Sequence, residues 1–265
     1  MDVLLKRVAT TLAIIGGLFL LLLQSTYWYG AYGLPDSLPS PAREYPESAR
    51  KLLWANAGGS GEIRIQRFSS IGIPLKSIGE DSRSLLEWQI GISDDDHRLP
   101  DRSDPGLRLL HQAAFDIAYS ITAAANPQPP VAANEGGSNA QMLQQIKMPR
   151  PFMEQAVASR LSREWPAERV IDSILENNYY GRGAKGLDQA ARTYFDLPVE
   201  QLSLAETAAL IAISRNFSYY DPSCKPREFA RAYQRLMLKT DDRVNLRDPD
   251  ADLSRMKRTP CERRN

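Results

Sequence analysis

The sequence predicts a mainly α-helical domain on a single N-terminal transmembrane helix, and three observations lead to this fold class. An uncharged apolar run lies close to the N-terminus. Most segments after it carry apolar residues at helical spacing. The chain has 265 residues, of which 43% are hydrophobic. That length is enough for one domain of roughly 200 residues with additional short segments.

The N-terminal apolar run extends from Val8 to Leu23, directly after Lys6 and Arg7. With its flanks, the stretch from Leu4 to Tyr27 is long enough to span a bilayer. Basic residues on the N-terminal flank favour a cytoplasmic N-terminus, and the aromatic residues that follow the run suit the membrane interface. We therefore expect a retained single-pass anchor. A cleaved signal peptide is the alternative.

Charge, proline and periodicity divide the chain into four segments. We expect a cytoplasmic stub with the anchor, a linker, a domain and a polar tail, at 1–29, 30–47, 48–240 and 241–265. Within the domain, Glu62–Phe68 and Leu85–Ile92 contain alternating apolar residues, which predicts a small antiparallel β element. Other segments predict helices, at 47–54, 107–125, 141–147, 152–163, 167–176 and 229–239.

The stretch from Glu176 to Pro222 has the clearest local signals. Three glycines mark a tight turn, at Gly181, Gly183 and Gly186. Glycine permits a positive φ and close backbone approach there. A helix follows from Leu187, and a second helix follows a capping box formed by Ser203 and Glu206.

Four blocks of this stretch resemble the peptidoglycan glycosyltransferase domain of class A penicillin-binding proteins and monofunctional transglycosylases. That family shows an FGRGAxG turn, an AARxYF helix, an LxLAExAxL helix and a Y-x-P turn, in this order. Here they lie at Tyr180–Gly186, Ala190–Phe195, Leu202–Glu206 and Tyr220–Pro222. The resemblance implies a lysozyme-like helical lobe, anchored in a bacterial inner membrane and facing the periplasm or the exterior.

The resemblance also implies a reaction, which is glycosyl transfer from lipid II, a polyprenyl pyrophosphate sugar. This reaction needs a base for the acceptor hydroxyl and cations or hydrogen-bond donors for the departing pyrophosphate. In the family, the base is the Glu of an EDxxFxxHxG motif. The expected position of this motif, near Ala57–Gly58, has neither Glu nor His. The segment that follows, at about 59–105, is interpreted as an insertion relative to the family. Glu80 is the replacement candidate for the catalytic base, and Glu62 is a second. A solvated carboxylate is the alternative for both.

The family's GGSTxxQQ motif survives in part. By resemblance, phosphate or sugar oxygens are bound at five residues, Gly137, Ser138, Gln144, Gln145 and Lys147. A loop leading into a helix is the alternative interpretation of this segment.

The family's RKxxE motif aligns with Arg150–Glu154, with Pro151 in place of the Lys. The resemblance implies a substrate-binding Arg150 and a catalytic Glu154. A structural ion pair is the alternative for Glu154. The bracing KxxxLExYLN helix aligns with Ala167–Glu176, with Asp172 at the position of the Glu.

These observations predict a peptidoglycan glycosyltransferase-like envelope protein that polymerises or binds lipid II glycan. The alternatives are a catalytically inactive paralogue, which binds glycan or lipid II or docks onto a cell-wall synthase, and a purely structural envelope protein. The sequence alone does not distinguish between these three interpretations.

Composition and the rarer residues add further limits. The net charge of +1 predicts no nucleic-acid partner. The two histidines, His97 and His111, have no cluster of further ligands, so we expect no metal site and no cofactor. The resemblance alone allows a divalent cation at the pyrophosphate. Cys224 and Cys261 form one disulfide if the compartment is oxidising, or remain two free thiols.

Overall fold

The computed structural model describes residues 2–76, 78–79, 104–125, 149–240 and 253–257. The chain divides into two compact units. Unit 1 contains residues 1–39, 66–104 and 110–165, and unit 2 contains residues 40–65, 105–109 and 166–265. In the described ranges the regular structure is helical, with no named β-strand. The predicted mainly α fold class is therefore confirmed.

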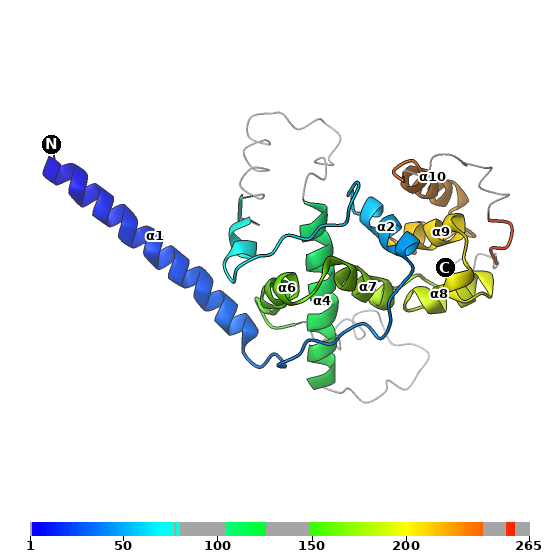
Figure 1. Cartoon of the computed structure of the whole chain (residues 1–265), viewed down its shortest axis with the longest axis horizontal. Helices are drawn as coiled ribbons and strands as arrows, with labels where there is room; N and C mark the ends of the chain where they lie inside the picture. Colours follow the sequence, from blue (N-terminus) through cyan, green and yellow to red (C-terminus); the bar gives the residue numbers. More distant parts are fainter. Residues whose placement is uncertain (1, 77, 80–103, 126–148, 241–252, 258–265) are drawn as a thin grey trace, which may run out of the picture. The chain divides into compact units, whose positions relative to one another are not determined.

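Unit 1 contains the long N-terminal helix α1 (Asp2–Ala31), α6 (Met153–Glu164) and most of α4 (Pro105–Ala125) (Figure 1). The part of α1 from Leu4 to Ala31 is long and apolar enough to cross a membrane, by its length and composition. Its apolar side chains are mostly exposed. This agrees with the predicted N-terminal apolar helix.

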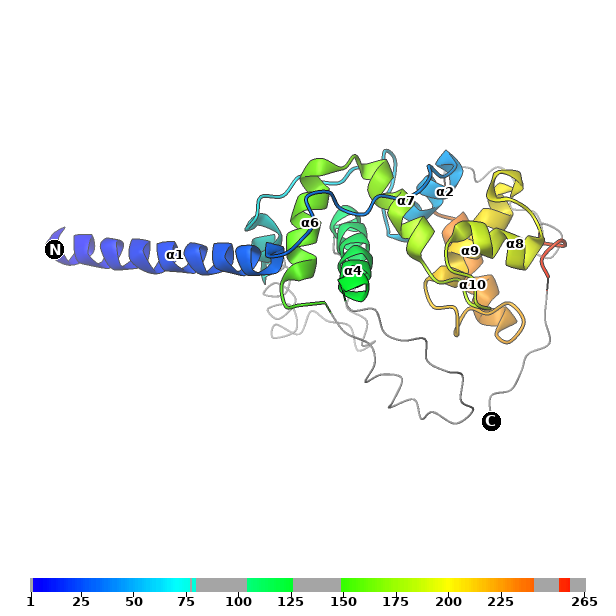
Figure 2. The same cartoon turned by 90° about the horizontal axis from the view of Figure 1, so that it is seen from below.

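The C-terminal end of α1 packs against the start of α6, as Figure 2 shows. At Gly30 the two backbones approach so closely that a Cβ atom would overlap the carbonyl group of Phe152. The ring of Tyr29 meets the ring of Phe152 edge-on, with centroids 6.5 Å apart. Arg163 of α6 donates to the Tyr27 hydroxyl over 3.1 Å. The aromatic end of α1 is thus part of the unit 1 fold.

Unit 2 is built around α9 (Leu204–Ser214), which contacts α2 (Glu47–Asn56), α8 (Leu187–Phe195) and α10 (Pro226–Met237). Two further elements complete it, α7 (Ala167–Asn177) and the 3₁₀ helix η1 (Val199–Gln201). The residues of α9 from Glu206 to Ile213 are all buried. A helix that is apolar on every side is stable only in the interior of a protein, so α9 forms the core of unit 2.

The glycine turn has the predicted conformation. Gly181, Gly183 and Gly186 all have positive φ. The Gly186 amide donates to the carbonyl of Asn178 over 2.8 Å. A Cβ at Gly186 would lie 2.7 Å from the carbonyl oxygen of Glu176. Glycine is therefore required by both the backbone conformation and the space at this residue.

The predicted capping box at the start of α9 is also confirmed. The Glu206 amide donates to the Ser203 hydroxyl over 3.2 Å, and the Ser203 amide donates to the Glu206 carboxylate over 2.8 Å. Two amides at the helix N-terminus that have no partner within the helix are satisfied in this way.

The β element is not formed where its first strand was predicted. Residues 63–69 have no regular structure, and the Phe68 amide donates to the Ser162 hydroxyl of α6 over 3.0 Å instead of to a neighbouring strand. A side chain on α6 thus takes the backbone bond that a β ladder would have used. The second predicted strand, Leu85–Ile92, lies outside the described residues, as does the helix predicted at 141–147.

Part of the segment predicted as a polar tail packs on unit 2. Leu253 and Met256 are buried, and the Lys257 amide donates to the Tyr194 carbonyl over 2.7 Å. Cys224 is a disulfide cysteine. The other cysteine of the chain, Cys261, lies outside the described residues.

Candidate active site

Two of the eight predicted site residues, Arg150 and Glu154, are in the described part of the chain, and both belong to unit 1. The other six lie outside the described residues: Glu80, Gly137, Ser138, Gln144, Gln145 and Lys147. The candidate site is therefore built around the turn from Arg150 to Met153 and the helix that follows it.

This turn positions the first residues of α6. The Met153 amide donates to the Arg150 carbonyl over 3.1 Å, which closes a four-residue turn. Phe152 has φ 63° and ψ −2°, the values of the third residue of a type II turn. Proline is favoured at the second residue of that turn, where Pro151 stands. The proline that replaces the family's Lys thus lies in the turn that leads into α6, and Glu154 falls in the first turn of that helix. A carboxylate is favourable there because the helix dipole is positive at the N-terminus.

Glu154 is paired with His111 of α4. Nδ1 of His111 lies 2.7 Å from Oε1 of Glu154, and the two side chains are 29% and 37% exposed. Within the part of the chain that the structure describes, neither side chain has another polar partner. Among the described residues, the second carboxylate oxygen and the second ring nitrogen of the pair are thus without a protein partner.

Arg150 does not contact Glu154 in any described interaction. Its guanidinium donates to the Tyr32 carbonyl and lies 5.8 Å from the centroid of the Tyr32 ring. The start of the predicted RKxxE segment is thus held by the residue that follows α1. Arg150 and Glu154 are brought into one turn, with their charged groups on different partners.

His111 was missed as a site residue in the sequence, although one signal was present. On α4 it lies at helical spacing from Leu107 and Ala114, both of which are buried. An ionisable residue at the edge of an otherwise apolar helix face indicates a partner on a neighbouring element. The sequence could not identify that partner, because Glu154 is 43 residues away.

Asp172, at the position of the family's Glu on the bracing helix, is a structural residue of unit 2. Both its oxygens accept from Arg50, over 2.7 Å from Nε and 2.6 Å from Nη2, and the Tyr45 amide lies 3.3 Å from Oδ1. The hydrogen bond to Asp172 raises the pKa of Arg50. Asp172 is 2% exposed. The guanidinium of Arg50 neutralises its negative charge, and this bond joins α7 to α2.

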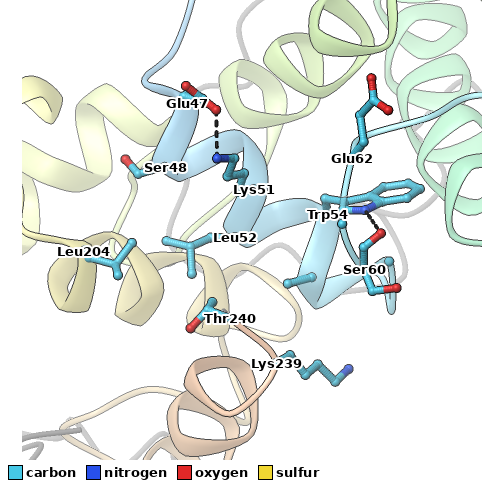
Figure 3. Close-up of a pocket in the computed structure, with 13 residues that line it drawn as sticks. Glu47, Ser48, Lys51, Leu52, Trp54, Ser60, Glu62, Leu204, Lys239 and Thr240 are labelled. Atoms are coloured by element: carbon cyan, nitrogen blue, oxygen red, sulfur yellow. Dashed lines mark hydrogen bonds and ion pairs between the residues drawn. The ribbon is translucent and has the colours of Figure 1, made fainter. Parts of the chain in front are cut away.

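Unit 2 also has a cavity of about 590 Å³ beside α2 (Figure 3). It includes the turn after Ala57–Gly58, where the family's first motif was expected. Of its charged lining residues, Lys51 lies 2.8 Å from Glu47, and Glu62 accepts a hydrogen bond from Arg64, outside the lining, over 3.1 Å. The hydrogen bond from Lys51 lowers the pKa of Glu47. Glu62, the second base candidate, is thus an exposed carboxylate paired with its neighbour.

The fold and the four sequence blocks together define a lysozyme-like helical protein with an apolar N-terminal helix. The transglycosylase family model matches residues 109–241, half of the chain, and the chain belongs to this family. The matched range includes His111, Arg150 and Glu154, whereas Glu62 and Glu80 precede it.

Several relatives are penicillin-binding proteins 1A. The protein of Mycobacterium tuberculosis (strain ATCC 25618 / H37Rv) is 43% identical over 77 residues, which is 29% of this chain and 9% of the relative. That of Rickettsia felis (strain ATCC VR-1525 / URRWXCal2) is 27% identical over 205 residues, 76% of this chain and 24% of the relative. The chain thus spans at most about a quarter of the length of these two relatives.

Proposed function

We propose that this chain is a peptidoglycan glycosyltransferase that polymerises lipid II, with Glu154 as a catalytic carboxylate. One observation carries the proposal. Glu154 stands at the RKxxE position, is partly exposed in the first turn of α6, and has one oxygen bonded to His111. A carboxylate that is positioned by one bond and open at its other oxygen is suited to bind a substrate hydroxyl or phosphate-linked sugar.

Membrane attachment supports this function, because the polyprenyl chain of lipid II is itself a membrane anchor. In the proposed topology, α1 spans the bacterial inner membrane once. Lys6 and Arg7 lie on the cytoplasmic side, and the helical units lie in the periplasm or outside the cell. The aromatic side chains of Trp28, Tyr29 and Tyr32 are exposed beyond the apolar run, which suits the interface on that outer side.

The remaining substrate contacts stay predictions from the family resemblance. We assign the binding of sugar or phosphate oxygens to the predicted set, Gly137, Ser138, Gln144, Gln145, Lys147 and Arg150. A divalent cation at the pyrophosphate, and Glu80 as a further catalytic carboxylate, belong to the same group of expectations.

A second candidate is a catalytically inactive paralogue that binds lipid II or glycan, or that docks onto a cell-wall synthase. The segment at the position of the family's first motif favours it. Ala57 and Gly58 lie in a turn at the end of α2, and neither offers a carboxylate for the acceptor hydroxyl.

Lipid II polymerisation by the purified full chain in detergent separates the two candidates. Wild type is compared with Glu154→Gln and Glu80→Gln, and Glu168→Gln, an exposed residue of α7, is the control. We expect glycan chains from wild type and Glu168→Gln, and a roughly 10²–10⁴-fold loss for Glu154→Gln. Saturable lipid II binding without any glycan would establish the binding protein. Absence of both would exclude the polymerase and the lipid II-binding protein, and would leave glycan binding or docking onto a cell-wall synthase.

A further inference from the structure

We propose that His111 is a catalytic residue, the general base that takes the proton of the acceptor sugar hydroxyl, and that Glu154 orients it. This inference rests on the proposed glycosyl transfer and adds the group that accepts the proton. It assigns to a histidine the task that the family's first-motif Glu would perform near Ala57–Gly58.

The hydrogen bond between the two side chains determines which nitrogen is free. An ionised carboxylate only accepts hydrogen bonds, so at 2.7 Å from Oε1 the Nδ1 atom of His111 is the donor. In a neutral imidazole with its proton on Nδ1, the Nε2 atom keeps its lone pair and acts as a base. Glu154 thus fixes the tautomer in which His111 is able to accept a proton.

Exposure allows a substrate to reach this nitrogen. The imidazole is 29% exposed and the carboxylate 37% exposed, so the pair is neither sealed in the core nor fully solvated. In the described residues, Nε2 of His111 and Oε2 of Glu154 have no protein partner. Side-chain exposure of this size leaves the pair within reach of a hydroxyl group that enters from solvent.

The pair contributes little to the stability of α4 and α6. Both helices bury apolar side chains, including Leu110, Ala114, Ala156 and Val157, each with no exposed surface. Even a fully charged pair with this exposure would add only about 0–1 kcal/mol to stability. Its geometry therefore calls for an explanation other than stability, and an oriented carboxylate–imidazole pair is a known arrangement for general base catalysis.

The acceptor hydroxyl gives its proton to Nε2 of His111, and its oxygen lone pair forms the new bond to the anomeric carbon of the donor sugar. The bond between that carbon and the phosphate oxygen breaks, and its electron pair leaves with the polyprenyl pyrophosphate. The resulting imidazolium is stabilised by Glu154 and later releases its proton to water.

The test uses the full chain and lipid II as the probe, with His111→Ala, His111→Asn and the control His97→Gln. We expect His111→Ala to lower kcat by roughly 10²–10⁴-fold, with lipid II binding unchanged within about threefold. Added imidazole should restore a substantial part of the kcat of His111→Ala, because a free base can enter the space of the missing ring. His97→Gln should behave as wild type.

His111→Asn separates a base from a residue that only positions Glu154. The asparagine amide still donates to the carboxylate but accepts no proton, so we expect it to be as inactive as His111→Ala. Wild-type activity in His111→Asn would overturn the base role. An active wild type with an equally active His111→Ala would overturn the inference and leave the proposed function intact.

A spectroscopic measurement tests the pair without turnover. In His97→Gln the chain has a single imidazole, and its ¹⁵N shifts report which nitrogen carries the proton. We expect the shifts of His111 to show the proton on Nδ1. This tautomer should be lost when Glu154→Gln is combined with His97→Gln. An Nε2–H form in the parent variant would overturn the inference. A wild type that makes no glycan would overturn the proposed function, and the base role with it, whichever tautomer is found.

Discussion

Glu154 in unit 1 and Asp172 in unit 2 are two carboxylates on consecutive labelled helices, α6 and α7, and their surroundings are opposite. Asp172 is buried and both its oxygens accept hydrogen bonds from Arg50. Glu154 is partly exposed, and one oxygen meets His111. A carboxylate whose bonding capacity is filled by the protein can stabilise the fold, but it has nothing left for a substrate. Glu154 retains that capacity.

Glu206 is a second buried carboxylate whose oxygens accept hydrogen bonds from the protein, as those of Asp172 do. It is 1% exposed, accepts from the Ser203 amide over 2.8 Å, and is bonded by Arg255 over 2.8 and 2.7 Å. We therefore expect the four variants below to differ in their free energy of unfolding. The variants that disturb the buried carboxylates Asp172 and Glu206 should lose the most stability, and the variant of Glu154 should lose the least.

Arg50→Ala should have the largest effect. It leaves the buried charge of Asp172 without its main partner, so we expect the free energy of unfolding to fall by about 3–5 kcal/mol. Urea unfolding followed by circular dichroism measures this change. Lys51→Ala is the control, since Lys51 is exposed on the same helix. A loss no larger than that of the control would show that the bond between Arg50 and Asp172 does not stabilise the fold.

Arg255→Ala should have an intermediate effect. Arg255 is 55% exposed while Glu206 is buried, and the Ser203 amide continues to satisfy part of the carboxylate. We expect a loss of about 1.5 kcal/mol, the lower end for a hydrogen bond to a charged group. The same unfolding experiment applies, with Arg235→Ala on α10 as a control whose guanidinium bonds within its own helix. An unchanged midpoint would show that the bond between Arg255 and Glu206 does not stabilise unit 2.

Ser203→Ala should cost about 1 kcal/mol, because α9 loses the hydroxyl that caps its N-terminus. Ser203→Thr keeps the hydroxyl and should stay close to wild type. If the two variants unfold alike, the cap contributes nothing beyond what burial of α9 already supplies.

Glu154→Gln should change the free energy of unfolding by less than about 0.5 kcal/mol, since a partly exposed pair contributes little. The same protein sample should have lost its polymerising activity. Thermal melting and the lipid II assay on one preparation test both statements. A loss of stability comparable to that of Arg50→Ala would make Glu154 a structural residue like Asp172.

The sequence predicted local structure well, because local structure depends on neighbouring residues. Helical periodicity indicated α4, and the Ser203–Glu206 spacing indicated a capping box that the structure contains. Gly186 was recognised from its turn context, and its positive φ confirms the reason.

Pairs distant along the chain could not be predicted from one sequence. His111 meets Glu154 across 43 residues, and Arg50 meets Asp172 across 122 residues. No periodicity or spacing encodes such a partner. The predicted strand at Glu62–Phe68 failed for the same reason: its alternation was real, but Ser162 of α6 takes the Phe68 amide. The packing of Leu253 and Met256 was missed because two apolar residues are a weak signal in a charged segment.

The bond between Arg50 and Asp172 also has a consequence for synthesis of the chain. A ribosome adds about 5–20 residues per second, so the 122 residues between the partners take roughly 6–24 s to make. During that interval α2 has been made, but neither α7 nor α9, against which it packs, has been. The whole of α4 and α6 is translated in between. Unit 2 is thus completed only after α4 and α6 have been made, around a helix that was made before either of them.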